Sequence, residues 1–498
     1  MADYLKKFIA GALVIFLFNI LGAAISYLMR FVMTSNLTPT DYGLFYSCFS
    51  LVGVFFLFKD FGLAQSLVYH VSKFMAAKEP EKLKNSVAIV TFVQAVPALM
   101  ILALTFIFAQ SLAVNYLHLA GAEIVKGALV IKILAAASVI TITYAVAQAV
   151  VQGAQRMKLF AFMEFSRLTF WFVFTYLFFA VGYSYLSPAL GYIATYLATT
   201  ILFSAPILGA LPKAKLAMDK KLAKDLALYG LPIMVSSVAG LIISYTDTII
   251  LTFFRTLAEV GIYQTAQPTA RLLWFFSGSL AVVLFPLVTE LKAKDCRLIE
   301  RGLSVLYRYI WVALVPAALL AFFFSAEILG LFFGQPYSQG SGVLKILSIG
   351  AIVFSLAHIN GSVLNGLGKP KNYTKVICAG GAVNLVANIL LIPAYGMEGA
   401  AAATLLTYLV MLVASFRELK KFIRPVLPFA EWAKTLLSGA ISLGAIYLLK
   451  GALALNLYLE IAVCLSVFVA VFLALILAFK VVRIEEAIGI AKQAAGIR

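Results

Sequence analysis

Long apolar runs separated by short polar connectors dominate the chain. The runs recur from Phe8 to Lys480, and most reach about 20 residues, enough to cross the hydrocarbon core of a bilayer as a helix. We therefore expect an all-α polytopic membrane protein. The pattern predicts about 14 transmembrane helices, with approximate spans of 8–35, 42–70, 85–111, 126–153, 159–182, 188–211, 226–254, 262–290, 303–325, 342–366, 373–393, 398–416, 433–450 and 457–480.

An internal repeat organises these helices. Segment 25–45 resembles segment 243–263, and a constant shift of 218 positions aligns the two without a gap. The shift places Ile25-Ser26-Tyr27 on Ile243-Ser244-Tyr245, Thr34 on Thr252, Asp41 on Glu259 and Gly43 on Gly261. The copies differ in charge. The first contains Arg30, and the second contains Asp247, which comes one position before the residue that aligns with Arg30.

The repeat predicts three segments along the chain. Residues 1–218 would form an N-lobe of helices 1 to 6, and residues 219–425 a C-lobe of helices 7 to 12. Residues 426–498 would hold helices 13 and 14 with a cytoplasmic C-terminus. Because six crossings return the chain to the same side, the lobes should be parallel repeats related by a pseudo-twofold axis along the membrane normal.

Composition supports a membrane protein and assigns its orientation. The chain is 63% hydrophobic and 12% charged, with a net charge of +18 and a mean hydropathy of +1.01. Most of the 39 basic residues fall in the connectors on one side of the predicted helices. By the positive-inside rule, that side is cytoplasmic, with both termini on it. The positive charge therefore indicates membrane topology, and we expect no nucleic-acid partner.

Motifs for metal-dependent or nucleotide-dependent chemistry are not apparent. The four cysteines are scattered without ligand spacing, so we expect neither a metal site nor a disulfide framework. The glycine-rich segment 334–342 lacks the Lys-Ser/Thr pattern of a phosphate-binding loop. We expect a protein that is not an enzyme and that needs no cofactor, apart from a coupling ion, Na⁺ or H⁺.

Several motifs resemble the multidrug/oligosaccharidyl-lipid/polysaccharide exporter superfamily, and most closely its polysaccharide-exporter branch, the Wzx-type flippases. The motifs span helices 1 to 12: Leu37-Thr38-Pro39-Thr40-Asp41-Tyr42-Gly43-Leu44-Phe45, Asp60-Phe61-Gly62-Leu63, 331–337 (LFFGQPY), 365–370 (NGLGKP), Asn384, Asn388 and 392–404 (IPAYGMEGAAAAT). The resemblance implies two lobes around a central cavity, alternating access, and a polyprenyl-diphosphate-linked oligosaccharide as cargo in the cytoplasmic (inner) membrane. It also implies membrane lipids and envelope glycan assembly enzymes as partners.

Three basic residues within the apolar runs are candidate substrate ligands: Arg30, Lys59 and Arg271. A charge at the bilayer centre is costly and normally faces a partner or a wet cavity. An arginine fork matches the oxygens of a diphosphate, and related lipid II flippases have a cationic cavity built from arginines on these helices. For Arg30 the alternatives are a structural pair with Asp247 or snorkelling to the outer interface.

Four further residues have other predicted roles. Asp247 and Asp60 are candidates for coupling or gating, and Asp60 is also a candidate for positioning its helix. Glu164 and Arg167 are three residues apart on one helix face, which predicts a structural ion pair.

Two other functions stay open. A cation-coupled multidrug exporter of the same superfamily would need a cavity dominated by acidic and aromatic residues. A membrane glycosyltransferase or polymerase would commonly carry a sizeable extracytoplasmic loop with catalytic groups, whereas every connector here is short.

Overall fold

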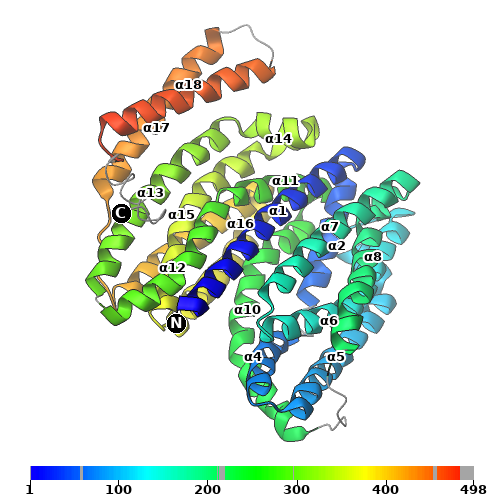
Figure 1. Ribbon diagram of the computed structural model, residues 1–498. Coiled ribbons are helices and arrows are strands. Elements are labelled where there is room, and N and C mark those ends of the chain that lie inside the picture. The colour runs from blue at the N-terminus through cyan, green and yellow to red at the C-terminus, as the bar shows by residue number, and fades with distance from the viewer. Residues whose placement is uncertain are drawn as a thin grey trace. The chain divides into compact units, whose positions relative to one another are not determined.

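All regular elements of the described residues are helices (Figure 1). The computed structural model describes residues 2–55, 60–209, 211, 219–294, 296–452 and 457–482. The α-helices are α1 (Ala2–Asn36), α2 (Pro39–Phe55), α4 (Leu63–Ala76), α5 (Pro80–Asn115), α6 (Glu123–Gly153), α7 (Met157–Val181), α8 (Ser187–Thr199), α9 (Ala205–Gly209), α10 (Lys220–Phe254), α11 (Leu257–Leu272), α12 (Phe275–Lys294), α13 (Cys296–Phe323), α14 (Ser325–Phe333), α15 (Ser341–Gly366), α16 (Pro370–Leu419), α17 (Phe429–Ala452) and α18 (Leu457–Ala478). Short 3₁₀ or π segments are η1 (Ser184–Leu186), η2 (Thr200–Ser204) and η3 (Gln335–Gly340).

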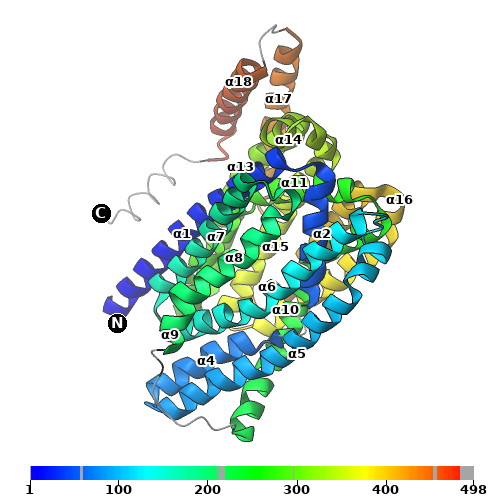
Figure 2. The ribbon, with the colours of Figure 1, turned by 90° about the vertical axis from the view of Figure 1, so that its right-hand side faces the viewer.

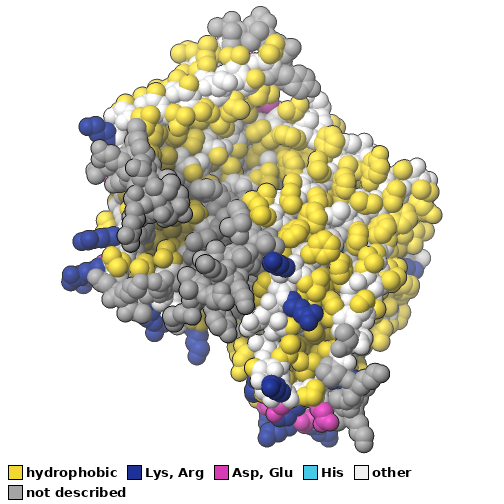
Figure 3. Space-filling model, viewed as in Figure 1, with side chains coloured by type: hydrophobic (Ala, Val, Ile, Leu, Met, Phe, Trp, Pro, Cys, Tyr) yellow, Lys and Arg dark blue, Asp and Glu magenta, His cyan; other side chains and the backbone are white. Residues whose placement is uncertain are grey.

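Ten helical stretches of the described chain are long and apolar enough to cross a membrane. Large apolar side chains on α5 are exposed, including Met100 at 60% and Ile107 at 72% of their surface. In Figure 3 hydrophobic side chains cover most of the visible surface over α5 to α8, and charged side chains gather at the end where α4 meets α5. An apolar band with a charged end is the surface expected of helices that face lipid.

The chain divides into two compact units. The first comprises Met1–Thr265, Leu329–Gln339 and Gly380–Ala403, and the second comprises Ala266–Ile328, Gly340–Ala379 and Thr404–Arg498. Because α11, α14 and α16 contribute residues to both, the units do not follow a single cut in the sequence. The predicted lobe boundaries at 218 and 425 stay a prediction.

In the first unit, helices α4, α5, α6 and the start of α10 share a buried apolar cluster, and α4 and α5 run beside each other (Figure 2). Helix α7 packs against both α1 and α8. In the second unit, α12, α13 and α15 enclose another cluster, and α17 pairs with α18. Each cluster packs the apolar faces of several helices together, and van der Waals packing of this kind helps to hold helices together in a bilayer.

Two expected continuous helices are interrupted. The prediction of one continuous helix over 42–70 is wrong. Helix α2 ends at Phe55 and α4 begins at Leu63, and the backbone is left-handed at Phe61 (φ 46°) and Gly62 (φ 72°). The predicted helix 262–290 divides into α11 and α12 around Trp274. Hydropathy cannot detect such breaks, because the apolar composition continues through them.

The repeat is visible where α2 crosses α11. A Cβ atom added to Gly43 would lie 1.7 Å from the carbonyl oxygen of Leu257, and one added to Gly261 would lie 2.0 Å from that of Pro39. Gly261 and Leu257 are the residues that the shift of 218 assigns to Gly43 and Pro39. The two helices therefore make the same close backbone contact in both directions, and each contact requires glycine.

Candidate functional site

Arg30 lies in the last part of α1 and is partly buried in the first unit. Its Nη1 donates hydrogen bonds to the hydroxyl of Tyr42 at 3.1 Å and to the backbone oxygen of Gln264 at 2.9 Å. Its guanidinium carbon lies 5.1 Å from the ring centroid of Tyr46. In the described part of the chain no carboxylate pairs with this cation, so its charge is met by aromatic and neutral oxygen groups.

The tyrosines that hold Arg30 come from one face of α2. Tyr42 and Tyr46 are four residues apart, and their ring centroids are 4.8 Å apart. Tyr42 is fully buried and also meets the ring of Tyr337, with centroids 6.1 Å apart. This packing fixes the rings, so the guanidinium has a defined position from which its fork can meet an anion.

Asp247 on α10 is fully buried and hydrogen-bonded on both oxygens. The hydroxyl of Tyr263 donates to Oδ2 at 2.7 Å, and Nδ2 of Asn388 donates to Oδ1 at 2.8 Å. A longer contact of 3.4 Å comes from Nδ2 of Asn384. The carbonyl Oδ1 of Asn388 is buried and has no hydrogen-bond partner, which leaves an acceptor beside the carboxylate.

Arg30 and Asp247 are linked through two neighbouring residues of α11. Tyr263 binds Asp247, and the next residue, Gln264, accepts from Arg30 through its backbone. The side chain of Gln264 donates to Thr248 at 2.6 Å. In the repeat register Thr248 corresponds to Arg30 and Gln264 to Tyr46, so an arginine–tyrosine contact in one copy matches a threonine–glutamine hydrogen bond in the other.

Asp60 lies at the break that precedes α4. Its Oδ1 accepts hydrogen bonds from Nε2 of Gln94 at 2.7 Å and from the backbone nitrogen of Ala64 at 3.1 Å. It also lines a cavity of about 280 Å³ in the first unit. Lys59, its neighbour in sequence, lies outside the described residues.

Arg271 lies in the last turn of α11 and belongs to the second unit. Its guanidinium lies 5.5 Å from the ring of Trp274, and its buried Nε has no hydrogen-bond partner. Trp274 packs on Phe354 with centroids 4.2 Å apart, and its indole nitrogen is also buried without a partner. Two unsatisfied buried donors side by side are costly unless a ligand or water meets them.

Glu164 and Arg167 form an ion pair on α7, with Nη2 of Arg167 2.8 Å from Oε2 of Glu164. Tyr144 and Gln148 on α6 also donate to Glu164. The pair therefore ties α7 to α6.

Several residues of these networks escaped the sequence analysis. Asn384 and Asn388 carried the family resemblance, and their spacing of four predicts a shared helix face, but nothing in the sequence connected them to Asp247. Tyr192, Tyr196 and Tyr245 line the cavity beside Asp60. The sequence identified Tyr245 only as the repeat equivalent of Tyr27, and it gave no signal for the other two, since tyrosines are frequent in the chain.

Comparison with known proteins identifies relatives over the whole length. A family model described as "Polysaccharide biosynthesis protein" matches residues 8–292. An uncharacterized membrane protein of Methanocaldococcus jannaschii is 29% identical, covering 97% of this chain and 98% of the relative. The probable low-salt glycan biosynthesis flippase Agl15 of Haloferax volcanii is 26% identical, covering 90% of this chain and 91% of the relative.

Solved structures share the fold. The lipid II flippase MurJ in an inward closed conformation matches with a TM-score of 0.76 at 16% identity, over 94% of this chain and 98% of that one. An inward-facing multidrug resistance MATE family transporter of the MOP superfamily matches with a TM-score of 0.67 at 12% identity, over 80% and 96%. The chain is thus a multi-pass membrane protein with a MurJ-like and MATE-like fold, and these relatives with named activities are flippases or transporters.

Proposed function

The chain belongs to the polysaccharide biosynthesis protein family, and on that premise we propose that it is a flippase for a polyprenyl-diphosphate-linked oligosaccharide. The diphosphate binds at Arg30 and the sugar occupies a polar cavity, while the lipid tail stays in the bilayer. Alternating access then exposes the headgroup on the outer side of the cytoplasmic membrane. The names of the Haloferax relative and of MurJ support this class of cargo.

The proposal depends mainly on the environment of Arg30. A guanidinium kept within the apolar part of α1 and paired with no carboxylate among the described residues is suited to an incoming anion. Its hydrogen bonds to Tyr42 and Gln264 both come from Nη1. The other N–H groups of this planar guanidinium can bind two oxygens of a phosphate group in a bidentate way.

Arg271, in the second unit, stays a proposed substrate-binding cation. Its unsatisfied buried Nε, next to the unsatisfied indole of Trp274, provides donors that an anionic group would complete. Lys59 remains a predicted third cation.

The topology of the proposed flippase follows from the sequence. We propose fourteen membrane crossings, two six-helix lobes related by a pseudo-twofold axis, and both termini in the cytoplasm. The reciprocal contact of Gly43 and Gly261 supports the twofold relation, and the one-sided basic connectors support the orientation.

Asp247 is the proposed coupling group. Its buried carboxylate and the unpartnered Oδ1 of Asn388 are oxygen ligands of the kind that hard cations prefer. A bound Na⁺ or a proton would neutralise this carboxylate, and Tyr263 and Gln264 would pass the change to Arg30 along α11.

A multidrug exporter is the second candidate, because the cavity beside Asp60 combines a carboxylate with three tyrosines. Deletion of the gene in its host separates the two. A flippase defect should accumulate lipid-linked oligosaccharide on the cytoplasmic face, restored by the wild type and not by Arg30→Gln. If deletion only sensitises cells to cationic dyes, the exporter is correct.

A further inference from the structure

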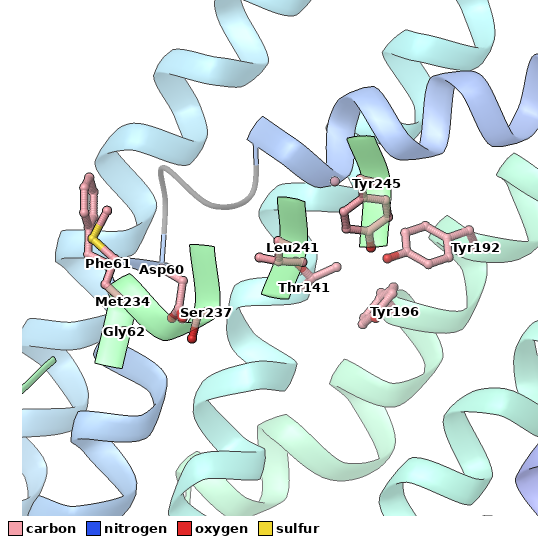
Figure 4. A pocket seen from close by; sticks show the side chains of 11 residues that line it. Asp60, Phe61, Gly62, Thr141, Tyr192, Tyr196, Met234, Ser237, Leu241 and Tyr245 are labelled. Atoms are coloured by element: carbon pink, nitrogen blue, oxygen red, sulfur yellow. The ribbon is translucent and has the colours of Figure 1, made fainter. Parts of the chain in front are cut away.

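The cavity beside Asp60 lies wholly within the first unit and is polar at both ends. Its polar lining residues are Asp60 and Ser237 at one end, Thr141 in the middle, and Tyr192, Tyr196 and Tyr245 at the other (Figure 4). Leu241 and Met234 add apolar surface between or beside them. A volume of about 280 Å³ places the cavity at the small end of ligand sites.

The backbone break positions the carboxylate end. Phe61 and Gly62 have left-handed conformations, and a Cβ on Gly62 would lie 2.3 Å from the carbonyl oxygen of Gly230 on α10. This close contact brings α10 against the break. Gln94 and the backbone of Ala64 both bind Oδ1 of Asp60, which fixes the carboxylate beside the cavity.

Packing of the rings positions the hydroxyl end. The ring of Tyr192 lies 4.9 Å from that of Tyr196 and 5.3 Å from that of Trp171. The ring of Tyr245 rests on Gly53, where an added Cβ would lie 3.1 Å from Cζ. The hydroxyls of Tyr192 and Tyr245 point toward the same space (Figure 4). Rings held in this way present hydroxyl groups with little loss of side-chain entropy on binding.

These groups match a sugar more closely than an organic cation. Each sugar hydroxyl both donates and accepts, as do tyrosine, serine and threonine hydroxyls, while a carboxylate accepts from one or two sugar hydroxyls. An organic cation would use Asp60 and the ring faces and would leave the hydroxyl groups without a role.

The cavity also lies close enough to Arg30 to receive a sugar attached to a phosphate that Arg30 binds. Arg30 contacts Tyr46 on α2, and Gly53 lines the cavity seven residues further along the same helix. Two helical turns separate these positions by about 10 Å on one face, and a phosphate bound at Arg30 would place the attached sugar within that reach.

We propose that this cavity is the subsite for the first sugar of the lipid-linked glycan, an inference that rests on the proposed function.

The test compares two probes on the purified full-length protein: a short-chain polyprenyl diphosphate and the same lipid carrying N-acetylglucosamine. The wild type should bind the sugar-bearing probe at least tenfold more tightly. Tyr245→Phe and Tyr192→Phe, which keep the packed rings, should each reduce that preference about threefold to tenfold through loss of one hydroxyl. Neither should change affinity for the bare diphosphate.

Controls separate the possible failures. Tyr176→Phe changes an exposed ring on α7 and should leave both affinities unchanged. If the wild type binds neither probe, the proposed function fails. If it binds both equally, or if the phenylalanine variants keep the full preference, the sugar subsite is wrong. Binding of tetraphenylphosphonium that disappears in Asp60→Asn, without any sugar preference, would assign the cavity to organic cations instead.

Discussion

Arg30 donates a hydrogen bond of 2.9 Å to the backbone oxygen of Gln264, an acceptor that the helix itself leaves open. The N–H that would normally bond to this oxygen belongs to residue 268, which is Pro268 and has none. The proline within α11 therefore creates the acceptor that anchors the intramembrane arginine.

Replacing this proline tests the link. Pro268→Ala supplies an N–H that competes with Arg30 for the oxygen of Gln264. Because proline in a helix interior costs about 3 kcal/mol, the variant should melt at a higher temperature in detergent. It should also bind a polyprenyl diphosphate more weakly, since the guanidinium loses an anchor. Unchanged affinity would mean that the hydrogen bond does not position Arg30 for the ligand.

A second prediction concerns ion coupling at Asp247. Asp247→Asn removes the charge while keeping a similar shape, so transport should lose its dependence on an imposed Na⁺ or proton gradient. Asp225→Asn, an exposed aspartate on the same helix, serves as the matched control. Measurement in proteoliposomes with each gradient identifies the ion. Gradient dependence that persists in Asp247→Asn would exclude this residue as the coupling group.

The glycine crossing gives a third prediction. Gly43→Ala or Gly261→Ala forces a methyl group against a backbone carbonyl of the partner helix, and such overpacking typically costs about 1–3 kcal/mol. Either variant should lower the detergent melting temperature. Gly240→Ala, where an added Cβ meets nothing within 4 Å, should be neutral or stabilising because alanine favours helix. Equal behaviour of all three variants would contradict the tight crossing.

The sequence predicted the repeat correctly and missed the helix breaks, and these two outcomes have different physical causes. Shared residues at a shift of 218 reflect a shared backbone contact, so the amino-acid sequence alone was enough to match Gly43 with Gly261. The break at Phe61 and Gly62 depends on the approach of Gly230 from α10, a long-range contact with no local signature.

The sequence predicted which charged residues belong to the candidate site, but it did not predict their hydrogen-bond partners. Charges within apolar runs marked Arg30, Arg271, Asp60 and Asp247 as residues of interest. The sequence suggested Arg30 as one partner for Asp247. In the structure this carboxylate accepts hydrogen bonds from Tyr263, Asn384 and Asn388. Neutral partners such as a backbone carbonyl or an amide leave no charge pattern from which they could be inferred.

Orientation provides a fourth prediction. Ala77 follows α4 on the side rich in lysine, and Ala122 precedes α6 on the opposite side of the proposed topology; both are exposed. In a cysteine-free background, Ala122→Cys should react with a membrane-impermeant thiol reagent added to intact cells, and Ala77→Cys should react only after lysis. The reverse pattern would invert the proposed topology.

The most direct test of the central proposal is translocation of a fluorescent polyprenyl-diphosphate saccharide in proteoliposomes, read from the fraction that an external quencher cannot reach. The wild type should move the probe across the bilayer, and Arg30→Lys, which keeps the charge and loses the fork, should do so slowly. Arg30→Gln should be inactive, while Arg156→Gln in the exposed α6–α7 connector should match the wild type. Equal translocation by Arg30→Gln and the wild type, or translocation of a cationic dye alone, would contradict the account.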